Sequence, residues 1–398
     1  MVGISTKKKN FSLLVKLVFC YEKLIGLCPV VLGKNGYLII SNTGAIYSLI
    51  LCIVYSIFYA RALINRSETV FPMETFIAAT VATYVDGMQF IIVIIAWLIF
   101  AFRQRRIIFI FENFEKADRI ARKLGIKDEN QSNIKMLCTR IICVNIIFGG
   151  LFFSKIAFSS ISPIFKWIIW VPFEFPHIVI HNLFTLFITA LDILERQFHK
   201  LNSNLTKLTV IFLRKHLCER SLSRDGEFPH FLNSLPLILN YFGKLHDELM
   251  DLSEMITDFF APVTLMALLI SFLQVVKNSY FFCLFITDFK VHERSDLLAT
   301  MYGSLWISVL VLEFIFLSFA SGTICYEANN TGNALLKLWV YYRPANCQKS
   351  IIKFSHQLIQ RKLKISLYGF IDLNYHFIYK IFGALTTYLI IMLQMDDD

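Results

Sequence analysis

The chain is poor in charged residues. Asp, Glu, Lys and Arg make up 17% of its 398 residues, whereas 56% are apolar, 15% are aromatic and the mean hydropathy is +0.58. Between Lys34 and Arg61 there is no charged residue at all. Soluble domains have about 25% charged residues, so this composition excludes a soluble globule and indicates a protein that crosses a membrane several times.

Other features are missing as well. The alternation of apolar and polar residues typical of a membrane barrel is absent, so we expect helical spans. The nine cysteines show no spacing that suits a zinc site. The chain has no nucleophile motif, phosphate-binding loop or metal-ligand constellation, so we expect neither an enzyme nor a cofactor. It also has no internal repeat, which argues against a transporter.

Seven apolar stretches are long enough to cross about 30 Å of hydrocarbon, which takes about 20 helical residues. They lie near residues 37–60, 75–102, 138–160, 164–190, 259–287, 297–325 and 370–395. Of the chain's 39 Lys and Arg residues, 30 precede the first stretch or follow the second, fourth and sixth, and only 7 lie in or beside the other three connections. Cytoplasmic segments retain positive charge, so the N-terminus is expected inside and the C-terminus outside, opposite to a seven-helix G-protein-coupled receptor.

This topology also accounts for the net charge of +10, because almost all of the excess lies in segments assigned to the cytoplasm. We therefore expect no nucleic-acid partner. Most cysteines fall in spans or on the cytoplasmic side, where a disulfide framework does not form. The basic N-terminus before Phe11–Cys20 suits either a signal peptide or an amphipathic helix at the inner interface, and Lys16 inside the apolar run favours the helix.

Between the fourth and fifth spans, apolar residues continue at helical spacing. One seam consists of Leu191, Leu194, Phe198, Leu201, Leu205, Leu208 and Phe212, and a second of Leu245, Leu249, Leu252, Ile256 and Phe259. Both spans should therefore extend into the cytoplasm as continuous helices, joined by a turn at Ser221–Pro229. Two interpretations are open: an antiparallel hairpin within one subunit, or a platform shared between subunits.

The last span is unusual for a lipid-facing helix. Its first half contains Asp372, His376 and Lys380, and the uncharged part, Ile381–Met395, rises only roughly 22 Å. Thr387, Ile391 and Gln394 share one face. Such a helix is better suited to face protein or water.

The C-terminal region resembles the insect gustatory receptor family. Thr387–Gln394 is similar to the terminal signature of that family, which has Thr-Tyr, three aliphatic residues, a spacer and Gln-Phe. Phe354–Leu358 and Gly369–Leu373 resemble the family's Phe-Ser-x-Gln-Leu and Gly-Phe-Phe-x-Leu/Ile segments. The chain departs from the pattern in a spacer that is longer by one residue and in Met395, which stands where the family has Phe.

The resemblance implies a chemosensory taste receptor that is itself a tetrameric, ligand-gated, non-selective cation channel. Its expected partners are a small-molecule tastant, a bitter compound rather than a sugar, the lipid bilayer and related subunits in a homo- or hetero-tetramer. Its expected location is the plasma membrane of sensory neurons. An odorant receptor-like channel subunit and a transducer-coupled receptor are the alternatives.

The expected fold is therefore an all-α membrane protein of seven transmembrane helices with a cytoplasmic anchor. It comprises a cytoplasmic N-terminal segment with an amphipathic helix (1–36), helices 1–4 (37–190), a cytoplasmic hairpin (191–258), helices 5–6 (259–325), cytoplasmic anchor helices (326–368) and a pore-lining helix 7 with an acidic tail (369–398).

The expected pore-lining residues are Thr387, Ile391, Gln394 and Met395, and Tyr388 packs behind them. An ion pair between Glu313 and Lys380 would position this helix, and Glu313 would otherwise be a neutral buried acid. Alternatively, Thr387, Ile391 and Gln394 would form a seam between helices within a monomer.

A ring of carboxylates at the outer mouth is expected from Asp396, Asp397 and Asp398, the alternative being a solvated tail. The expected ligand-binding residues lie in the outer halves of the helices: Tyr84, Asp86, Trp167, Trp170, Glu174, His177, Gln274, Tyr280, Tyr302 and Trp306. Aromatic residues at helix ends also form interfacial belts, which is the alternative for each of them. His177 and His181 have the spacing of two metal ligands but no third ligand, so we expect them to be hydrogen-bonded within the fold or to line a cavity instead.

Overall fold

The computed structural model describes residues 13–32, 38–68, 76–126, 130–158, 163–219, 228–287, 294–341 and 348–396. Its helices are α1 (Leu13–Leu24), α2 (Asn42–Glu68), α3 (Phe76–Phe102), α4 (Gln104–Lys123), α5 (Asn130–Phe158), α6 (Pro163–Glu219), α7 (Phe228–Thr287), α8 (Arg294–Tyr341), α9 (Gln348–Gln360) and α10 (Tyr375–Asp396). Two antiparallel hairpins pair β1 (Val31–Leu32) with β2 (Leu38–Ile39) and β3 (Ser366–Leu367) with β4 (Ile371–Asp372).

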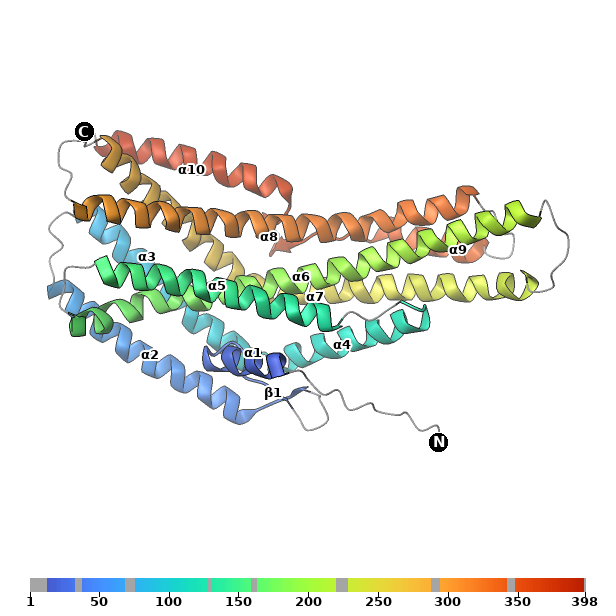
Figure 1. Ribbon diagram of the computed structural model, residues 1–398, viewed down its shortest axis with the longest axis horizontal. Coiled ribbons are helices and arrows are strands. Elements are labelled where there is room, and N and C mark those ends of the chain that lie inside the picture. The colour runs from blue at the N-terminus through green and yellow to red at the C-terminus, as the bar shows by residue number, and fades with distance from the viewer. Residues whose placement is uncertain are drawn as a thin grey trace.

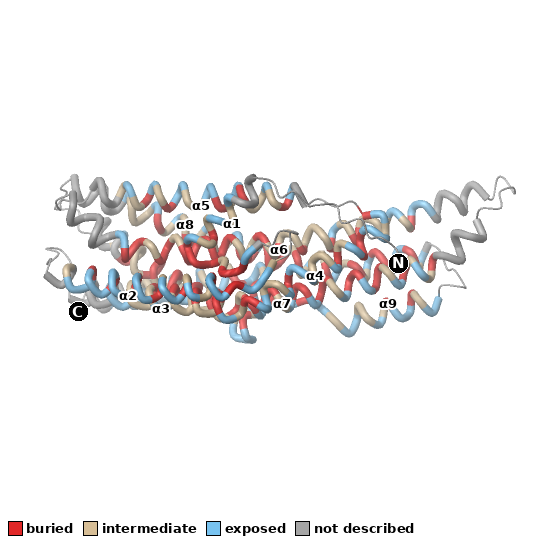
Figure 2. Tube along the Cα trace, turned by 90° about the horizontal axis from the view of Figure 1, so that it is seen from below, coloured by how far each residue is buried: buried red, intermediate tan, exposed pale blue. Residues whose placement is uncertain are grey.

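The molecule is elongated because three helices run along most of its length. Helices α6, α7 and α8 form this spine (Figure 1). Around one half of the spine lie α2, α3, α5 and α10, and beside the other half lie α4 and α9. We call the second half the extension. Buried residues follow the long axis of the molecule, so the two halves share one continuous core (Figure 2).

Six helical segments within the described part of the chain are long and apolar enough to cross a membrane by length and composition. They are Asn42–Asn65, Thr83–Phe102, Ser132–Ser154, Val171–Ile211, Leu235–Tyr280 and Met301–Val340. The seventh expected span corresponds to α10, which has 22 residues. The expectation of an all-helical membrane protein is confirmed, with the two hairpins as minor additions.

The helical continuity expected from the first seam is confirmed by α6, which runs unbroken for 57 residues. Leu191, Leu194, Phe198, Leu201 and Leu205 are all fully buried. The Phe198 ring lies edge-on to His246 of α7 at 5.5 Å, and α6 makes its most extensive contact with α8. These five residues of the seam are therefore buried within a single chain, and the side chain of Phe212 lies outside the described residues.

One of the two prolines in α6 leaves a backbone carbonyl without its helical hydrogen bond, and a neighbouring helix supplies the donor. Pro176 has no N–H, so the carbonyl of Pro172, four residues earlier, lacks its usual helical donor. The hydroxyl of Tyr55 on α2 donates to this carbonyl at 2.8 Å. This bond ties α2 to α6 at a depth where an unsatisfied carbonyl would be costly.

The segment after α1 docks into the bundle. Ile25, Leu27 and Val30 are buried, and the indole N–H of Trp97 donates to the carbonyl of Ile25 at 2.7 Å. Glu22 is only 4% exposed, and neither of its carboxylate oxygens has a hydrogen-bond partner among the described residues. Burial raises the pKa of this carboxyl to about 8.

Candidate functional site

Polar and aromatic side chains from four helices meet inside the bundle. This central cluster consists of Gln89 on α3, Phe148 on α5, His177 and His181 on α6, and Trp306 and Glu313 on α8. All except Glu313 are buried, and Glu313 is half-buried. Buried ionisable groups in a membrane bundle are costly and are typical of functional sites.

The aromatic part of the cluster is centred on Trp306. His177 lies edge-on to its indole with 4.5 Å between ring centroids, and Phe148 does so at 5.5 Å. Tyr302, one turn earlier on α8, stacks against Trp306 at 6.0 Å and 24°. Aromatic rings with a few polar groups are the usual lining of a site for small amphipathic molecules.

The polar part of the cluster joins α6 to α8. The imidazole Nδ1 of His181 contacts the Glu313 carboxylate, and the His181 ring stacks on Phe148. Nδ1 of His177 faces the side-chain amide of Gln89 at 3.4 Å. Each histidine thus has a partner on another helix through one of its ring nitrogens.

Several polar atoms of this cluster are buried without a hydrogen-bond partner in the described part of the chain. They are Oε1 of Gln89, Nε2 of His181 and Oε2 of Glu313. Buried polar atoms in folded proteins are nearly always satisfied, so orphaned ones need an explanation such as water or a ligand. The three atoms supply two acceptors and a ring nitrogen, enough to orient a small polar molecule.

The structure brings together some of the residues expected to bind ligand and separates others. His177, Tyr302 and Trp306 belong to the cluster region, and Glu174 is buried one turn before His177. Tyr84 is 59% exposed and lies outside it. The other expected residues are the half-buried Asp86 on α3, the buried Gln274 and Tyr280 on α7, and Trp167 and Trp170 on α6, whose side chains lie outside the described residues.

Sequence reasoning missed Gln89, Phe148 and the role of Glu313. Gln89 carried a usable signal, since it is a polar residue within the apolar helix α3, three positions after Asp86. Phe148 carried no such signal, because the chain has 39 phenylalanines and residue type alone does not single out one of them.

The expected ion pair between Glu313 and Lys380 is wrong. Glu313 pairs with His181, and the Lys380 side chain is exposed on α10. The reason is the rotation of α10, which packs Ile381 and Leu385 against α7 and α8. Lys380 instead shares the opposite face with Thr387, seven residues later.

This opposite face of α10 is exposed along its described length. Thr387, Ile391 and Gln394 all lie on it, and the Thr387 hydroxyl bonds back to the Gly383 carbonyl at 3.0 Å. Tyr388 meets Phe272 of α7 edge-on at 5.9 Å, so it supports the helix from the side. Met395 and Asp396 end α10, and their side chains lie outside the described residues. Asp397 and Asp398 lie outside them entirely.

The entry to α10 is held close to α8. The Tyr375 ring covers Gly322, where a Cβ atom would lie 2.6 Å from the ring, and it also meets Phe319 edge-on at 5.5 Å. The preceding β3–β4 hairpin turns through Gly369, whose φ of +74° favours glycine. Upstream, Gln357 of α9 donates to the Gly243 carbonyl of α7 at 3.0 Å. Gln357 of the first motif thus joins α9 to α7, and Tyr375, two residues after the Gly369–Leu373 segment, joins α10 to α8.

Comparison with known proteins identifies relatives of this chain. The family described as 7tm Chemosensory receptor matches residues 15–398. Gustatory and pheromone receptor 32a of Drosophila melanogaster is 28% identical over 166 residues, which are 42% of this chain and 35% of that protein. Gustatory receptor 68a of the same species is 27% identical over 125 residues, 31% of this chain and 32% of that protein. The matched region thus spans about a third of each curated relative.

Solved structures match over nearly the whole length. The insect olfactory receptor OR5 from Machilis hrabei superposes with a TM-score of 0.66 at 14% identity, covering 96% of this chain and 97% of that one. The same receptor in complex with eugenol gives a TM-score of 0.67 with the same identity and coverage. At this identity the likeness establishes the fold.

Proposed function

Because the chain belongs to the 7tm chemosensory receptor family, we propose that it is a taste-type receptor that detects a small molecule and is itself a ligand-gated, non-selective cation channel. Four subunits, identical or related, would surround one pore lined by α10. The family membership and the multi-pass helical fold are the premises. The channel activity, the tetramer and a place in the plasma membrane of sensory neurons are the proposal.

The exposed face of α10 is the observation that carries this proposal. One face of the helix packs on α7 and α8, whereas Thr387, Ile391 and Gln394 are exposed on the other. A polar stripe facing lipid is unfavourable, so we expect it to meet the same stripe of neighbouring subunits around water. Ile391 would then form an apolar constriction and Gln394 a polar ring.

The central cluster is the proposed ligand site. It has aromatic walls, orphaned polar atoms and no lysine or arginine among its members. The related receptor from Machilis hrabei was solved with eugenol, and we propose that this chain likewise takes a small organic molecule. A bitter compound fits the proposal better than a sugar, since a sugar needs many hydrogen bonds and the cluster offers few.

Helix α8 would connect the ligand site with the pore helix. Trp306 and Glu313 lie in the cluster, and Gly322, two to three turns further, contacts Tyr375 at the start of α10. A ligand that displaces Trp306 would therefore shift α8 against α10. Coupling requires that the ligand bind the open and closed arrangements with different affinity.

Excised-patch recording of the purified chain in liposomes tests the proposal. We expect a chemical panel of bitter compounds, sugars and odorants to open a cation current without nucleotides or cytosolic proteins. A current that depends on cytosolic transducers would support the transducer-coupled receptor instead. Activation by odorants alone would support the olfactory alternative.

A further inference from the structure

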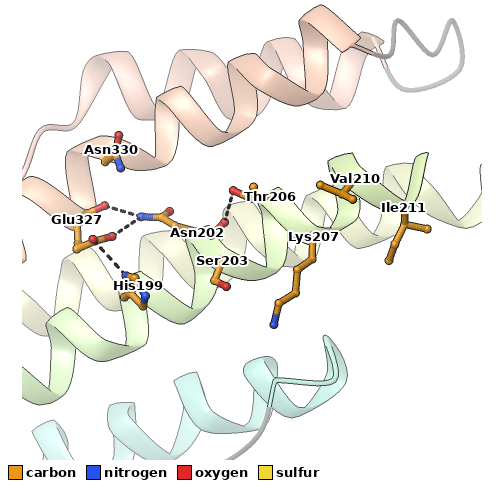
Figure 3. A pocket seen from close by; sticks show the side chains of 9 residues that line it. All are labelled: His199, Asn202, Ser203, Thr206, Lys207, Val210, Ile211, Glu327 and Asn330. Carbon is orange, nitrogen blue, oxygen red and sulfur yellow. Dashed lines mark hydrogen bonds and ion pairs between the residues drawn. The ribbon is translucent and has the colours of Figure 1, made fainter. Parts of the chain in front are cut away.

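A second group of chemically competent side chains lies in the extension, away from the central cluster and the pore helix. Glu195 and His199 are one turn apart on α6 and face Glu327 on α8 (Figure 3 shows His199 and Glu327). One ligand atom from each residue lies within 4.8 Å of the other two. We call these three residues the donor cluster.

The donor cluster is held in place by hydrogen bonds around Glu327. Asn202 on α6 donates to the Glu327 carboxylate at 3.0 Å and to its backbone carbonyl at 2.8 Å (Figure 3). The Thr331 hydroxyl in turn donates to the Asn202 side-chain carbonyl at 2.8 Å. Such outer contacts fix the orientation of ligating side chains in metal sites.

The charges of the cluster are unbalanced. Two carboxylates lie together, and the imidazole Nδ1 of His199 is 3.2 Å from Glu327. At Glu195, the electrostatic effect of Glu327 is opposed by that of His199 and Arg196. The nearby Arg196 points to the Met136 sulfur on α5 at 3.1 Å. A cation between the three donors would offset the repulsion of the carboxylates.

The cluster is also accessible. The His199 side chain is 64% exposed, and it lines a depression of about 560 Å³ together with Glu327 and Asn330 (Figure 3). A hydrated ion can enter such a space, and the exposed imidazole can turn to shorten the donor separations toward those of a coordination sphere. Lys207, two turns beyond His199, also lines this depression.

We propose that Glu195, His199 and Glu327 form a binding site for a divalent transition-metal ion, Zn²⁺ in the first place. One imidazole nitrogen and two carboxylate oxygens suit Zn²⁺ with water as the fourth ligand, whereas Ca²⁺ and Mg²⁺ prefer oxygen donors alone. The bound ion would clamp α6 to α8 in the extension. The site does not depend on the proposed function, because it is defined by these donors alone.

Calorimetric titration with Zn²⁺ tests the proposal on the full-length chain in detergent, purified without a polyhistidine tag. We expect one saturable site that millimolar Ca²⁺ or Mg²⁺ does not displace. His199→Asn, Glu195→Gln and Glu327→Gln should each weaken binding by about tenfold or more, and Asn202→Leu, which removes the outer hydrogen bonds, by about tenfold. His356→Asn and Glu112→Gln, exposed residues on α9 and α4, are the matched controls and should bind as the unaltered chain does.

Chemical protection provides a measurement on the unaltered chain. Zn²⁺ should protect His199 from diethyl pyrocarbonate, as read by mass spectrometry of its peptide, while His356 remains reactive. The proposal is overturned if Zn²⁺ binds equally to all three ligand variants, which would place the ion on other groups such as the exposed Cys20. It is equally overturned if no saturable site is found or if His199 is not protected.

Discussion

The imidazole of His177 meets the indole of Trp306 edge to face, with 4.5 Å between their centroids and 76° between their planes. The contact joins α6 to α8 at the centre of the proposed ligand site. We expect His177→Ala and Trp306→Ala each to raise the half-maximal ligand concentration by about tenfold, equivalent to about 1.4 kcal/mol. Dose responses of the current measure this. Phe316→Ala, an exposed aromatic on the same helix, is the control, and an equal shift there would remove the assignment.

The pore assignment predicts that substitution affects the current at one of two adjacent isoleucines and not at the other. Ile391 lies on the proposed pore face, and Ile390 is turned about 100° away, although both are about half exposed in the single chain. Ile391→Ala should raise the current without ligand, since it widens an apolar constriction. Gln394→Ala should alter relative cation permeability. Ile390→Ala should do neither, and wild-type behaviour of all three variants would contradict a pore lined by this face.

The bond from Tyr55 to the Pro172 carbonyl predicts a compensating pair. Tyr55→Phe removes the donor and should lower the free energy of unfolding by about 1–3 kcal/mol, the cost of a buried unsatisfied group. Pro176→Ala restores an N–H that can bond the same carbonyl along the helix. Thermal melting of the double variant should therefore show less loss than Tyr55→Phe alone. Additive losses would argue against the explanation.

Burial of Glu22 predicts a dependence of stability on pH. Its pKa rises from the ordinary 4.5 to about 8, so the folded chain favours the protonated carboxyl. The stabilising contribution is complete below pH 4.5 and is lost as pH rises to about 8. Melting temperatures measured between pH 5 and 9 should fall with pH, and Glu22→Gln should flatten this slope. Glu112→Gln, at an exposed position of α4, should leave the slope unchanged.

The close contact between Gly322 of α8 and Tyr375 of α10 predicts that adding one methyl group at Gly322 disturbs the packing of the two helices. A Cβ atom at Gly322 would lie 2.6 Å from the Tyr375 ring, so Gly322→Ala must displace the ring. We expect a destabilisation of about 1–3 kcal/mol and an altered ligand sensitivity. Gly332→Ala on the same helix, with nothing within 4 Å of its Cβ position, is the control. Tyr375→Ala should relieve the effect of Gly322→Ala in the double variant.

Properties that depend on neighbours along one helix could be predicted from the sequence. Hydrophobic length predicted the spans, and the spacing of Leu191, Leu194 and Phe198 predicted an unbroken helix beyond the fourth span. The spacing of Thr387, Ile391 and Gln394 placed them on one face, which the structure leaves exposed. Such features follow from the helical repeat and the thickness of the bilayer, both of which act locally.

Contacts between helices were decided by the tertiary structure. The partner of Glu313 is His181 rather than Lys380, because the rotation of α10 about its axis is set by packing against α7 and α8. The meeting of Glu195 and His199 with Glu327, more than 120 residues away, likewise depends on the register between α6 and α8. A rotation of one residue, about 100°, would separate each pair. The sequence by itself therefore determined which segments are helical and apolar, and only the packed bundle determined which side chains meet.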